Sequence, residues 1–201
     1  PNIPDRVTAG LPTVGLRVPD HPVALELIRA AQVPIAAPSA NEFTRLSPTA
    51  APHVDLPGVA LVLDGGPARV GIESTVLSLA SDRPKLLRPG MVTREQIEAI
   101  IGPIDVIDPK QKEGAHEAPG LHRRHYRPKA PLRWWDGEST TGHVLRMKDL
   151  GATPAEYAKN LYAALHEADR QHAAHIALEK PPASPEWAAI RDRLSRAVEK
   201  D

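Results

Sequence analysis

The first half of the chain alternates short apolar runs with more polar stretches. Five runs are rich in aliphatic or β-branched residues and are bounded by Gly, Pro or polar residues, which is the pattern of strands. They lie at 13–18, 33–41, 59–66, 73–80 and 84–88. Several are nearly all apolar, as is typical of strands that are buried on both faces. This pattern predicts a sheet with a well-covered core.

Two helices are expected among these strands. Val23, Leu27 and Ala30 recur at helical spacing, and we expect Asp20 to cap that helix. The second helix is expected to begin after Thr93, because Thr followed three residues later by Gln has the spacing of a capping box. Gly102 is expected to end it. Strands interspersed with helices predict an α/β fold.

The last seventy or so residues predict a second, smaller α/β unit. Thr153-Pro154-Ala155-Glu156 combines a cap, a proline at the first helical position and an acidic first turn. The apolar face of the helix that follows contains Tyr157, Leu161, Ala164, Leu165 and Ala168. Another helix is expected from Ser184, with Trp187, Ile190, Leu194 and Ala197 on its buried side, and the segment 175–180 is expected as a strand between the helices.

The two parts are joined by a long stretch without apolar periodicity. Residues 108–131 are rich in Pro, Gly, His and charge, which is typical of a linker or a functional loop. Composition changes across it: 18 of the 22 prolines lie at or before Pro131, and Phe43 is the only aromatic residue before Tyr126. We therefore divide the chain into a first domain at 1–107, a linker at 108–130 and a second domain at 131–201.

Charge and composition exclude several classes of protein. The 201 residues hold 25 Lys and Arg against 25 Asp and Glu, so bulk charge gives no argument for nucleic acid or a membrane as partner. The absence of cysteine excludes disulfides and thiolate chemistry and is compatible with the cytoplasm, where we expect the protein. No apolar run reaches the eighteen or so residues of a membrane-spanning helix.

Candidate chemistry lies at the ends of the apolar strands. These positions are Thr13, Arg17, Ser39, Asn41, Ser47, Thr49, Glu73, Ser74, Thr75 and Arg88. An arginine at the end of a buried strand reaches either solvent or an anion, because burying an unpaired charge is costly. Arg17 and Arg88 beside hydroxyls and an amide suit a carboxylate or a phosphate. The alternatives are surface ion pairs for the arginines and turn or capping roles for Ser39 and Asn41.

The basic stretch 122–129 has three interpretations. It is a solvated linker, a nucleic-acid patch with one aromatic for stacking, or a loop that folds over an anionic ligand. The pairs His122 with His125 and His172 with His175 suggest a metal, but no acidic or thiolate partner lies at ligand spacing. We therefore expect no metal site in the protein.

Taken together, the motifs resemble those of a known family. T-A-G-L-P-T-V-G-L-R-V-P, A-A-P-S-A-N, S-P-T, L-D-G-G, G-I-E-S-T-V and L-R-P-G occur in the order seen in the YrdC-like domain. The stretch 118–129, A-P-G-L-H-R-R-H-Y-R-P-K, resembles the linker that joins this domain to a smaller α/β domain in threonylcarbamoyl-AMP synthases. The resemblance implies a twisted mixed sheet with helices, a long linker and a small Rossmann-like C-terminal domain.

The resemblance also implies a reaction. A nucleotidyltransferase of this family makes L-threonylcarbamoyladenylate and pyrophosphate from L-threonine, bicarbonate and ATP, with Mg²⁺ accompanying ATP. A separate transferase then passes the threonylcarbamoyl group to tRNA. Carried over by position, Arg17, Ser39 and Ser74 would bind threonine. ATP would be bound by Thr13, Asn41, Thr49, Arg88 and Tyr126, with Tyr126 reaching back from the linker. No catalytic acid–base pair is implied, and no residue is assigned a catalytic role.

Two departures from the family pattern limit these expectations. The family's domain begins upstream of Pro1 with a segment that contains a Lys-x-Arg motif, so we expect an N-terminally truncated sheet and an inactive, aggregation-prone 201-residue fragment. The stretch 42–46, E-F-T-R-L, replaces the usual Ser-Gly before S-P-T. A non-catalytic RNA-binding or ribosome-associated module is the alternative function, and a carbamoyl-transfer maturation factor is a third.

Overall fold

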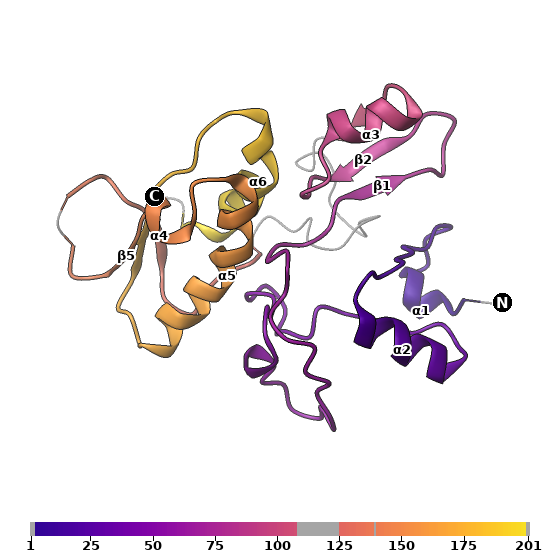
Figure 1. The fold of residues 1–201 in the computed structure, drawn as a ribbon, viewed down its shortest axis with the longest axis horizontal. Helices are drawn as coiled ribbons and strands as arrows, with labels where there is room; N and C mark the ends of the chain where they lie inside the picture. The colour runs from indigo at the N-terminus through magenta and orange to yellow at the C-terminus, as the bar shows by residue number, and fades with distance from the viewer. Residues whose placement is uncertain (1–2, 108–124, 139, 200–201) are drawn as a thin grey trace.

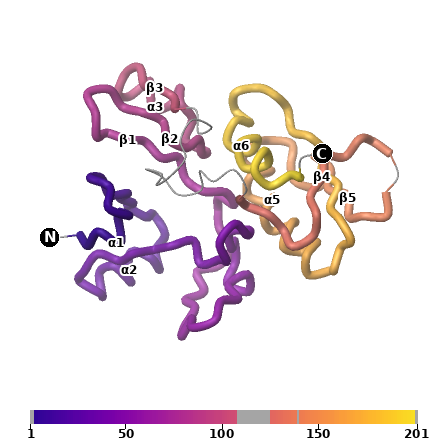
Figure 2. Tube along the Cα trace, turned by 180° about the vertical axis from the view of Figure 1, so that it is seen from behind, coloured from indigo at the N-terminus to yellow at the C-terminus, as the bar shows by residue number. Residues whose placement is uncertain are grey.

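The computed structural model describes residues 3–107, 125–138 and 140–199. In Figure 1 the elements before residue 107 spread over one side of the molecule, and the elements after residue 131 gather on the other side. Figure 2 shows the same two groups from behind. We call residues 3–107 the first region and residues 125–199 the C-terminal region. Most of the expected linker lies outside the described residues.

The first region is only partly organised into helices and strands. Its elements are α1 (Asp5–Thr8), α2 (Pro22–Ala31), the 3₁₀ turn η1 (Ala51–His53), β1 (Val76–Ser78), β2 (Lys85–Arg88), α3 (Arg94–Ile101) and β3 (Asp105–Val106). The strands form a mixed sheet in the order β1-β2-β3, with β1 antiparallel and β3 parallel to β2. The expected strands at 73–80 and 84–88 are therefore confirmed in shortened form.

Three expected strands are wrong as strands. The segments 13–18, 33–41 and 59–66 contain no strand, and none of their residues is buried. A strand exists only when its peptide groups pair with a neighbour, and none of these segments pairs with a described neighbour. Their apolar side chains are correspondingly open to solvent, with Val18 at 92% and Leu61 at 76% exposure.

The two helices that the sequence predicts in the first region both form, but only one has the predicted cap. α2 begins at Pro22 with His21 as its N-cap, so the expected cap at Asp20 is wrong. The Asp20 carboxylate pairs instead with the Arg69 guanidinium. By contrast, α3 has the expected Thr93 capping box and ends at Gly102, whose φ of 82° suits glycine.

The C-terminal region is a parallel sheet covered by helices, which confirms the small α/β unit. Its elements are β4 (Leu132–Trp134), β5 (His143–Leu145), α4 (Met147–Leu150), α5 (Pro154–Arg170), β6 (Ile176–Leu178), the 3₁₀ turn η3 (Pro185–Trp187) and α6 (Ala188–Ala197). Both outer strands run parallel to β6 in the order β4-β6-β5. The Thr153 capping box opens α5 as expected, and the helix expected from Ser184 begins as η3.

One core dominates the molecule, and it lies in the C-terminal region. Tyr157, Leu161 and Leu165 of α5 are each 0% exposed, and Ile190 of α6 is also 0% exposed. Leu46, Ile72 and Tyr126, which precede this region's sheet in the chain, pack into the same core. The loops that contain Leu46 and Ile72 are therefore anchored on the C-terminal region.

Among the described residues, no helix is long and apolar enough to cross a membrane.

Candidate functional site

Glu73 of the G-I-E-S-T motif is the centre of a polar cluster between the two regions. Its Oε1 accepts a hydrogen bond from Ser47 Oγ at 2.6 Å. Its Oε2 accepts from Arg193 Nε at 2.8 Å and from the Tyr162 hydroxyl at 3.3 Å. Ser47 comes from the S-P-T motif, whereas Arg193 and Tyr162 come from α6 and α5. One carboxylate thus joins two loops of the first region to two helices of the C-terminal region.

Arg193 is entirely buried and uses all three of its nitrogens. Besides its bond to the Glu73 side chain, it donates through Nη2 to the Glu73 main-chain oxygen at 3.0 Å. Its Nη1 donates to Asp192 Oδ2 at 2.8 Å. The guanidinium carbon also lies 5.4 Å from the centre of the Tyr126 ring. A buried arginine is strongly destabilising unless its charge and its N–H groups are paired in this way.

The L-R-P-G motif lies directly against the G-I-E-S-T motif. Arg88 is 3% exposed and donates through Nε to the main-chain oxygen of Ser74 at 3.0 Å. Gly90 approaches so closely that a Cβ there would lie 2.2 Å from the Thr75 nitrogen. Burial, and then the positive charge of Arg193, lower the pKa of Arg88. Arg88 is therefore a buried cation rather than a member of a surface ion pair.

The S-P-T motif is held by two histidines. Thr49 is 8% exposed, and its Oγ1 lies 3.2 Å from His53 Nδ1. The His53 ring stacks on His166 of α5 at 4.0 Å, and His166 Nε2 lies 3.1 Å from the Ser47 main-chain oxygen. Burial is the largest cause that lowers the pKa of both histidines. Thr49 is thus positioned by the contact between the regions.

The Asn41 side chain stabilises a turn through its amide nitrogen, while its amide oxygen bonds to no described residue. Its Nδ2 donates to the main-chain oxygens of Glu42 at 2.8 Å and Arg45 at 3.1 Å, which stabilises the turn. Its Oδ1 is buried and has no hydrogen-bond partner among the described residues. A buried acceptor of this kind is costly unless a donor meets it.

Tyr126 lies inside the contact between the regions. It is 1% exposed, and its ring stacks on Tyr162 with the centroids 6.0 Å apart. Burial, and then the charge of Glu73, raise its pKa. Its contact with a nucleotide stays a prediction. Within the basic stretch, Arg127 pairs with Glu199 at 3.0 Å, whereas His122 and the two arginines that follow it lie outside the described residues.

The remaining predicted residues lie apart from this cluster. Thr13, Arg17 and Ser39 belong to segments of the first region without helix or strand, and Arg17 and Ser39 are exposed. Arg17 makes no ion pair with any residue that the structure describes. The structure therefore gathers Ser47, Thr49, Glu73, Ser74, Arg88 and Tyr126 near the C-terminal region, and it leaves the proposed threonine-carboxylate ligand on an open segment.

Sequence reasoning missed Arg193 and Tyr162. A signal was present for Arg193, because it lies three residues after Ile190 and four before Ala197, on the apolar face of α6. A basic residue on a buried helical face needs a partner of opposite charge. Glu73 is conspicuous in the sequence as a polar residue at a strand end, but nothing local links two residues 120 positions apart.

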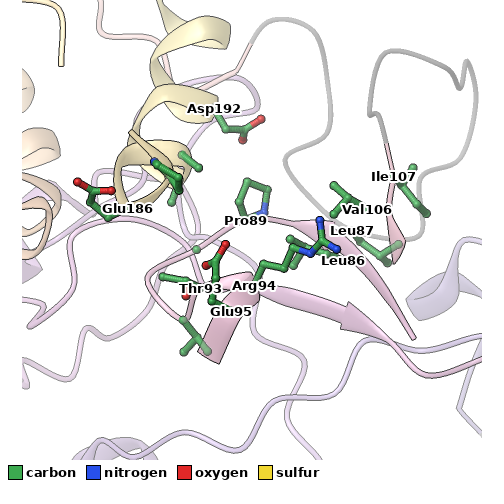
Figure 3. Close-up of a pocket in the computed structure, with 15 residues that line it drawn as sticks. Leu86, Leu87, Pro89, Thr93, Arg94, Glu95, Val106, Ile107, Glu186 and Asp192 are labelled. Atoms are coloured by element: carbon green, nitrogen blue, oxygen red, sulfur yellow. The ribbon is translucent and has the colours of Figure 1, made fainter. Parts of the chain in front are cut away.

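A cavity of about 290 Å³ borders the cluster. Figure 3 shows Leu86, Leu87 and Pro89 on the first-region side of it and Glu186 and Asp192 on the side of η3 and α6. Asp192 also pairs with Arg193, so the cavity wall and the cluster share a residue. Among the residues that the structure describes, no three His, Cys, Asp or Glu side chains are grouped so as to hold a metal ion.

Two family models match the chain. The model described as "Threonylcarbamoyl-AMP synthase, C-terminal domain" matches residues 92–198. The model described as "Telomere recombination" matches residues 1–90. Together they span almost the whole chain.

Curated relatives match over almost the whole chain. Threonylcarbamoyl-AMP synthase of Bacillus subtilis is 42% identical over 96% of this chain and 65% of that protein. The corresponding enzymes of Pyrococcus abyssi and Schizosaccharomyces pombe are 35% and 33% identical over 97% and 98% of this chain. The chain spans just under two thirds of the length of these relatives, with 66% of the second and 60% of the third covered.

Solved structures agree with the fold. The crystal structure of P. abyssi Sua5 complexed with L-threonine matches with a TM-score of 0.85 and 34% identity, over 99% of this chain and 69% of that one. A structure of the P. abyssi H234A/Y235A variant matches with a TM-score of 0.81. The α/β architecture expected from the sequence is thereby confirmed.

Proposed function

We propose a function on the premise that the chain belongs to the threonylcarbamoyl-AMP synthase family: the protein joins L-threonine, bicarbonate and ATP into L-threonylcarbamoyladenylate. The observation that carries the proposal is the match, over 99% of this chain, to a relative solved with L-threonine. The relatives' names support a catalytic role over a non-catalytic RNA-binding module.

The proposed reaction has two bond-forming steps. The threonine amine attacks the carbon of bicarbonate, and loss of water leaves a carbamate. A carbamate oxygen then attacks the α-phosphorus of ATP, and pyrophosphate leaves with the electrons of the broken phosphoanhydride bond. Such a reaction depends on positioning and on neutralising phosphate charge, with Mg²⁺ entering as the counter-ion of the ATP substrate.

The residues of the chain divide between the two substrates. Arg17 is proposed to bind the threonine carboxylate. This assignment is supported by the Arg17 guanidinium, which makes no ion pair with any residue that the structure describes. Ser39 and Ser74 are proposed as its neighbours on the threonine side. ATP is proposed to contact Thr13, Asn41, Thr49, Arg88 and Tyr126. The Asn41 Oδ1 supports this part, because it is buried without a hydrogen-bond partner among the described residues and gains from a donor on the ligand. The buried positive charge of Arg88 suits an anionic ligand.

The product is a reactive mixed anhydride, which implies a consumer. We propose that a separate transferase moves the threonylcarbamoyl group to tRNA, and that the protein meets tRNA only through that enzyme. The reaction uses ATP and precedes tRNA modification, so the proposal places it in the cytoplasm. The formal net charge of zero is consistent with a pocket for small anions rather than a polynucleotide surface.

The test uses the full-length protein with threonine, bicarbonate, ATP and Mg²⁺. We expect pyrophosphate release that requires threonine, and release equal to a threonine-free control would refute the function. In Arg17→Ala, the KM for threonine should rise by about 10- to 100-fold, the range for loss of a charge-assisted contact. The matched control is Arg29→Ala, because Arg29 is an exposed arginine of α2 that pairs only with Glu26 in the described structure. Its KM should not change.

A further inference from the structure

We propose that Arg193 is a positioning residue for the substrate site: acting through Glu73, it fixes the segment that contains Ser74 and meets Arg88. The C-terminal region would then set the geometry of the site rather than merely accompany it. The inference rests on the proposed function for its kinetic consequence, and on geometry alone for its structural one.

The contact between Arg193 and Glu73 is a clamp on one residue. Nε binds the Glu73 carboxylate at 2.8 Å, and Nη2 binds the main-chain oxygen of the same residue at 3.0 Å. The first bond fixes the side-chain rotamer, and the second fixes the orientation of the peptide that leads to Ser74. The next main-chain oxygen, that of Ser74, accepts from Arg88 Nε at 3.0 Å. Arg193 and Arg88, a proposed ATP ligand, therefore bind the main-chain oxygens of two consecutive residues.

The energetics indicate that this arginine has a purpose beyond packing. Its side chain is 0% exposed, and the Glu73 side chain is only 16% exposed. Taking such charges out of water costs several kcal/mol per ion in real proteins, and an apolar residue of similar volume often serves stability equally well. Ile190 and Leu194 on the same face show that α6 packs well with apolar residues. What the apolar alternative cannot supply is the two directed bonds to Glu73.

The two residues before Glu73 are also held against the C-terminal region. A Cβ on Gly71 would lie 2.4 Å from the Ala158 main-chain oxygen and 2.5 Å from that of Lys159, so the loop touches the backbone of α5. Ile72 is 6% exposed and packs into the C-terminal core. Packing on α5 thus fixes residues 71 and 72, and α6 fixes residue 73 through Arg193.

Variants of Arg193 in the full-length protein test the proposal. Arg193→Lys keeps the charge but replaces the rigid planar fork, whose Nε and Nη2 reach the two Glu73 oxygens, by a single flexible ammonium, and Arg193→Met removes the charge. If Arg193 positions the site, both variants raise the KM for threonine by about tenfold or more, since small displacements of a site are costly. The fall in melting temperature should be much larger for Met than for Lys. A purely structural role predicts that Lys restores KM together with stability, and that outcome would overturn the proposal.

Arg196→Lys is the matched control. Arg196 lies one turn further along α6, is 8% exposed and pairs with the same Asp192 at 2.8 Å, but no hydrogen bond or ion pair joins it to Glu73 among the residues that the structure describes. We expect its KM for threonine to match the wild type. An equal rise in KM in the Arg196 variant would show that any disturbance of α6 suffices, and it would contradict the specific role of Arg193.

A second readout separates this inference from the proposed function. Hydrogen exchange of residues 74–78, whose strand β1 pairs with β2, reports the position of the segment without any substrate. Exchange should be faster in Arg193→Lys and unchanged in Arg196→Lys. If the wild type lacks threonine-dependent turnover, the proposed function fails while exchange still decides the positioning role. Unchanged exchange in Arg193→Lys would refute that role whatever the activity.

Discussion

Apolar residues of the same kinds stay unburied over residues 3–45 and 50–70 of the first region but form the core of the C-terminal region. No residue from 3 to 45 is buried, and Leu16 and Leu61 are 85% and 76% exposed. In the C-terminal region, Leu161 and Leu165 are each 0% exposed. The difference lies in neighbours rather than in hydrophobicity. A helix or strand buries its apolar face only where another layer covers it.

The contrast also shows that the core does not follow the division of the chain into domains. Leu46 and Ile72 belong to the first region in sequence but to the C-terminal core in packing. Gly71 lies against the backbone of α5, and Glu73 accepts hydrogen bonds from Tyr162 of α5 and Arg193 of α6. The motifs that we propose to bind substrates therefore include loops that rest on the second unit. Stability and function are expected to be coupled through these few residues.

The largest effect is expected from truncating the C-terminal core. Leu161→Ala should lower the free energy of unfolding by about 3 kcal/mol, within the range for buried leucines. Leu61→Ala should leave it unchanged, because that side chain is already 76% exposed. Urea unfolding followed by tryptophan fluorescence is the measurement, since Trp134, Trp135 and Trp187 all lie in the C-terminal region. Equal losses would mean that the two regions form one cooperative core.

A smaller loss is expected where the first region touches α5. Gly71→Ala should cost about 1–3 kcal/mol, the usual range for overpacking, because the new methyl meets main-chain oxygens. Gly15→Ala is the control, because its Cβ would meet nothing within 4 Å. The same tryptophan-detected unfolding measures both. A Gly71 variant as stable as the wild type would show that the loop is not held against α5.

Helix capping sharpens the comparison further. Thr153→Ala removes the capping box of α5 and should lower the free energy of unfolding by about 1 kcal/mol. Thr93→Ala removes an equivalent box from α3, which lies in the first region. We expect that variant to leave the tryptophan-detected transition in place. The same shift in both variants would indicate that α3 unfolds together with the C-terminal core.

The smallest effect is a pH dependence at the stacked histidines. Burial lowers the pKa of His53 and His166 from the ordinary value of 6.5, so the folded state binds fewer protons than the unfolded state below that pH. Stability should therefore fall as the pH drops below 6.5, and His166→Gln should reduce that fall. His172→Gln, at an exposed position, is the control. The free energy of unfolding is measured at several pH values below 6.5. An equal loss of stability in the His166→Gln variant and the wild type would contradict the account.

Much of the fold could be predicted because its signals are local. The Thr93 and Thr153 boxes, the proline that starts α5 and the apolar face of α6 all act within a few residues, and the structure confirms each. The absence of strands at 13–18 and 59–66 was not predictable in this way. The composition of these segments is right for a buried strand, but pairing depends on a neighbour that a local pattern does not contain.

The residues of the site likewise divide into those with a local signal in the sequence and those without one. Arg88, Ser74 and Thr49 lie at strand ends and in turns, where polar residues beside apolar runs are conspicuous in the sequence. The partners of Glu73 could not be found there, because Tyr162 and Arg193 follow it by 89 and 120 residues. Only the packing of α5 and α6 against the loops brings these groups together.

The central claim, that a clamp from the C-terminal region holds the site loop, is tested most directly by a double-mutant cycle. Glu73→Gln, Arg193→Met and the double variant are unfolded in urea, with tryptophan fluorescence as the signal. A direct contact predicts a coupling free energy of about 1–3 kcal/mol, because either single change leaves a buried polar partner behind and the second adds little. Strictly additive losses, with a coupling below about 0.5 kcal/mol, would contradict the clamp.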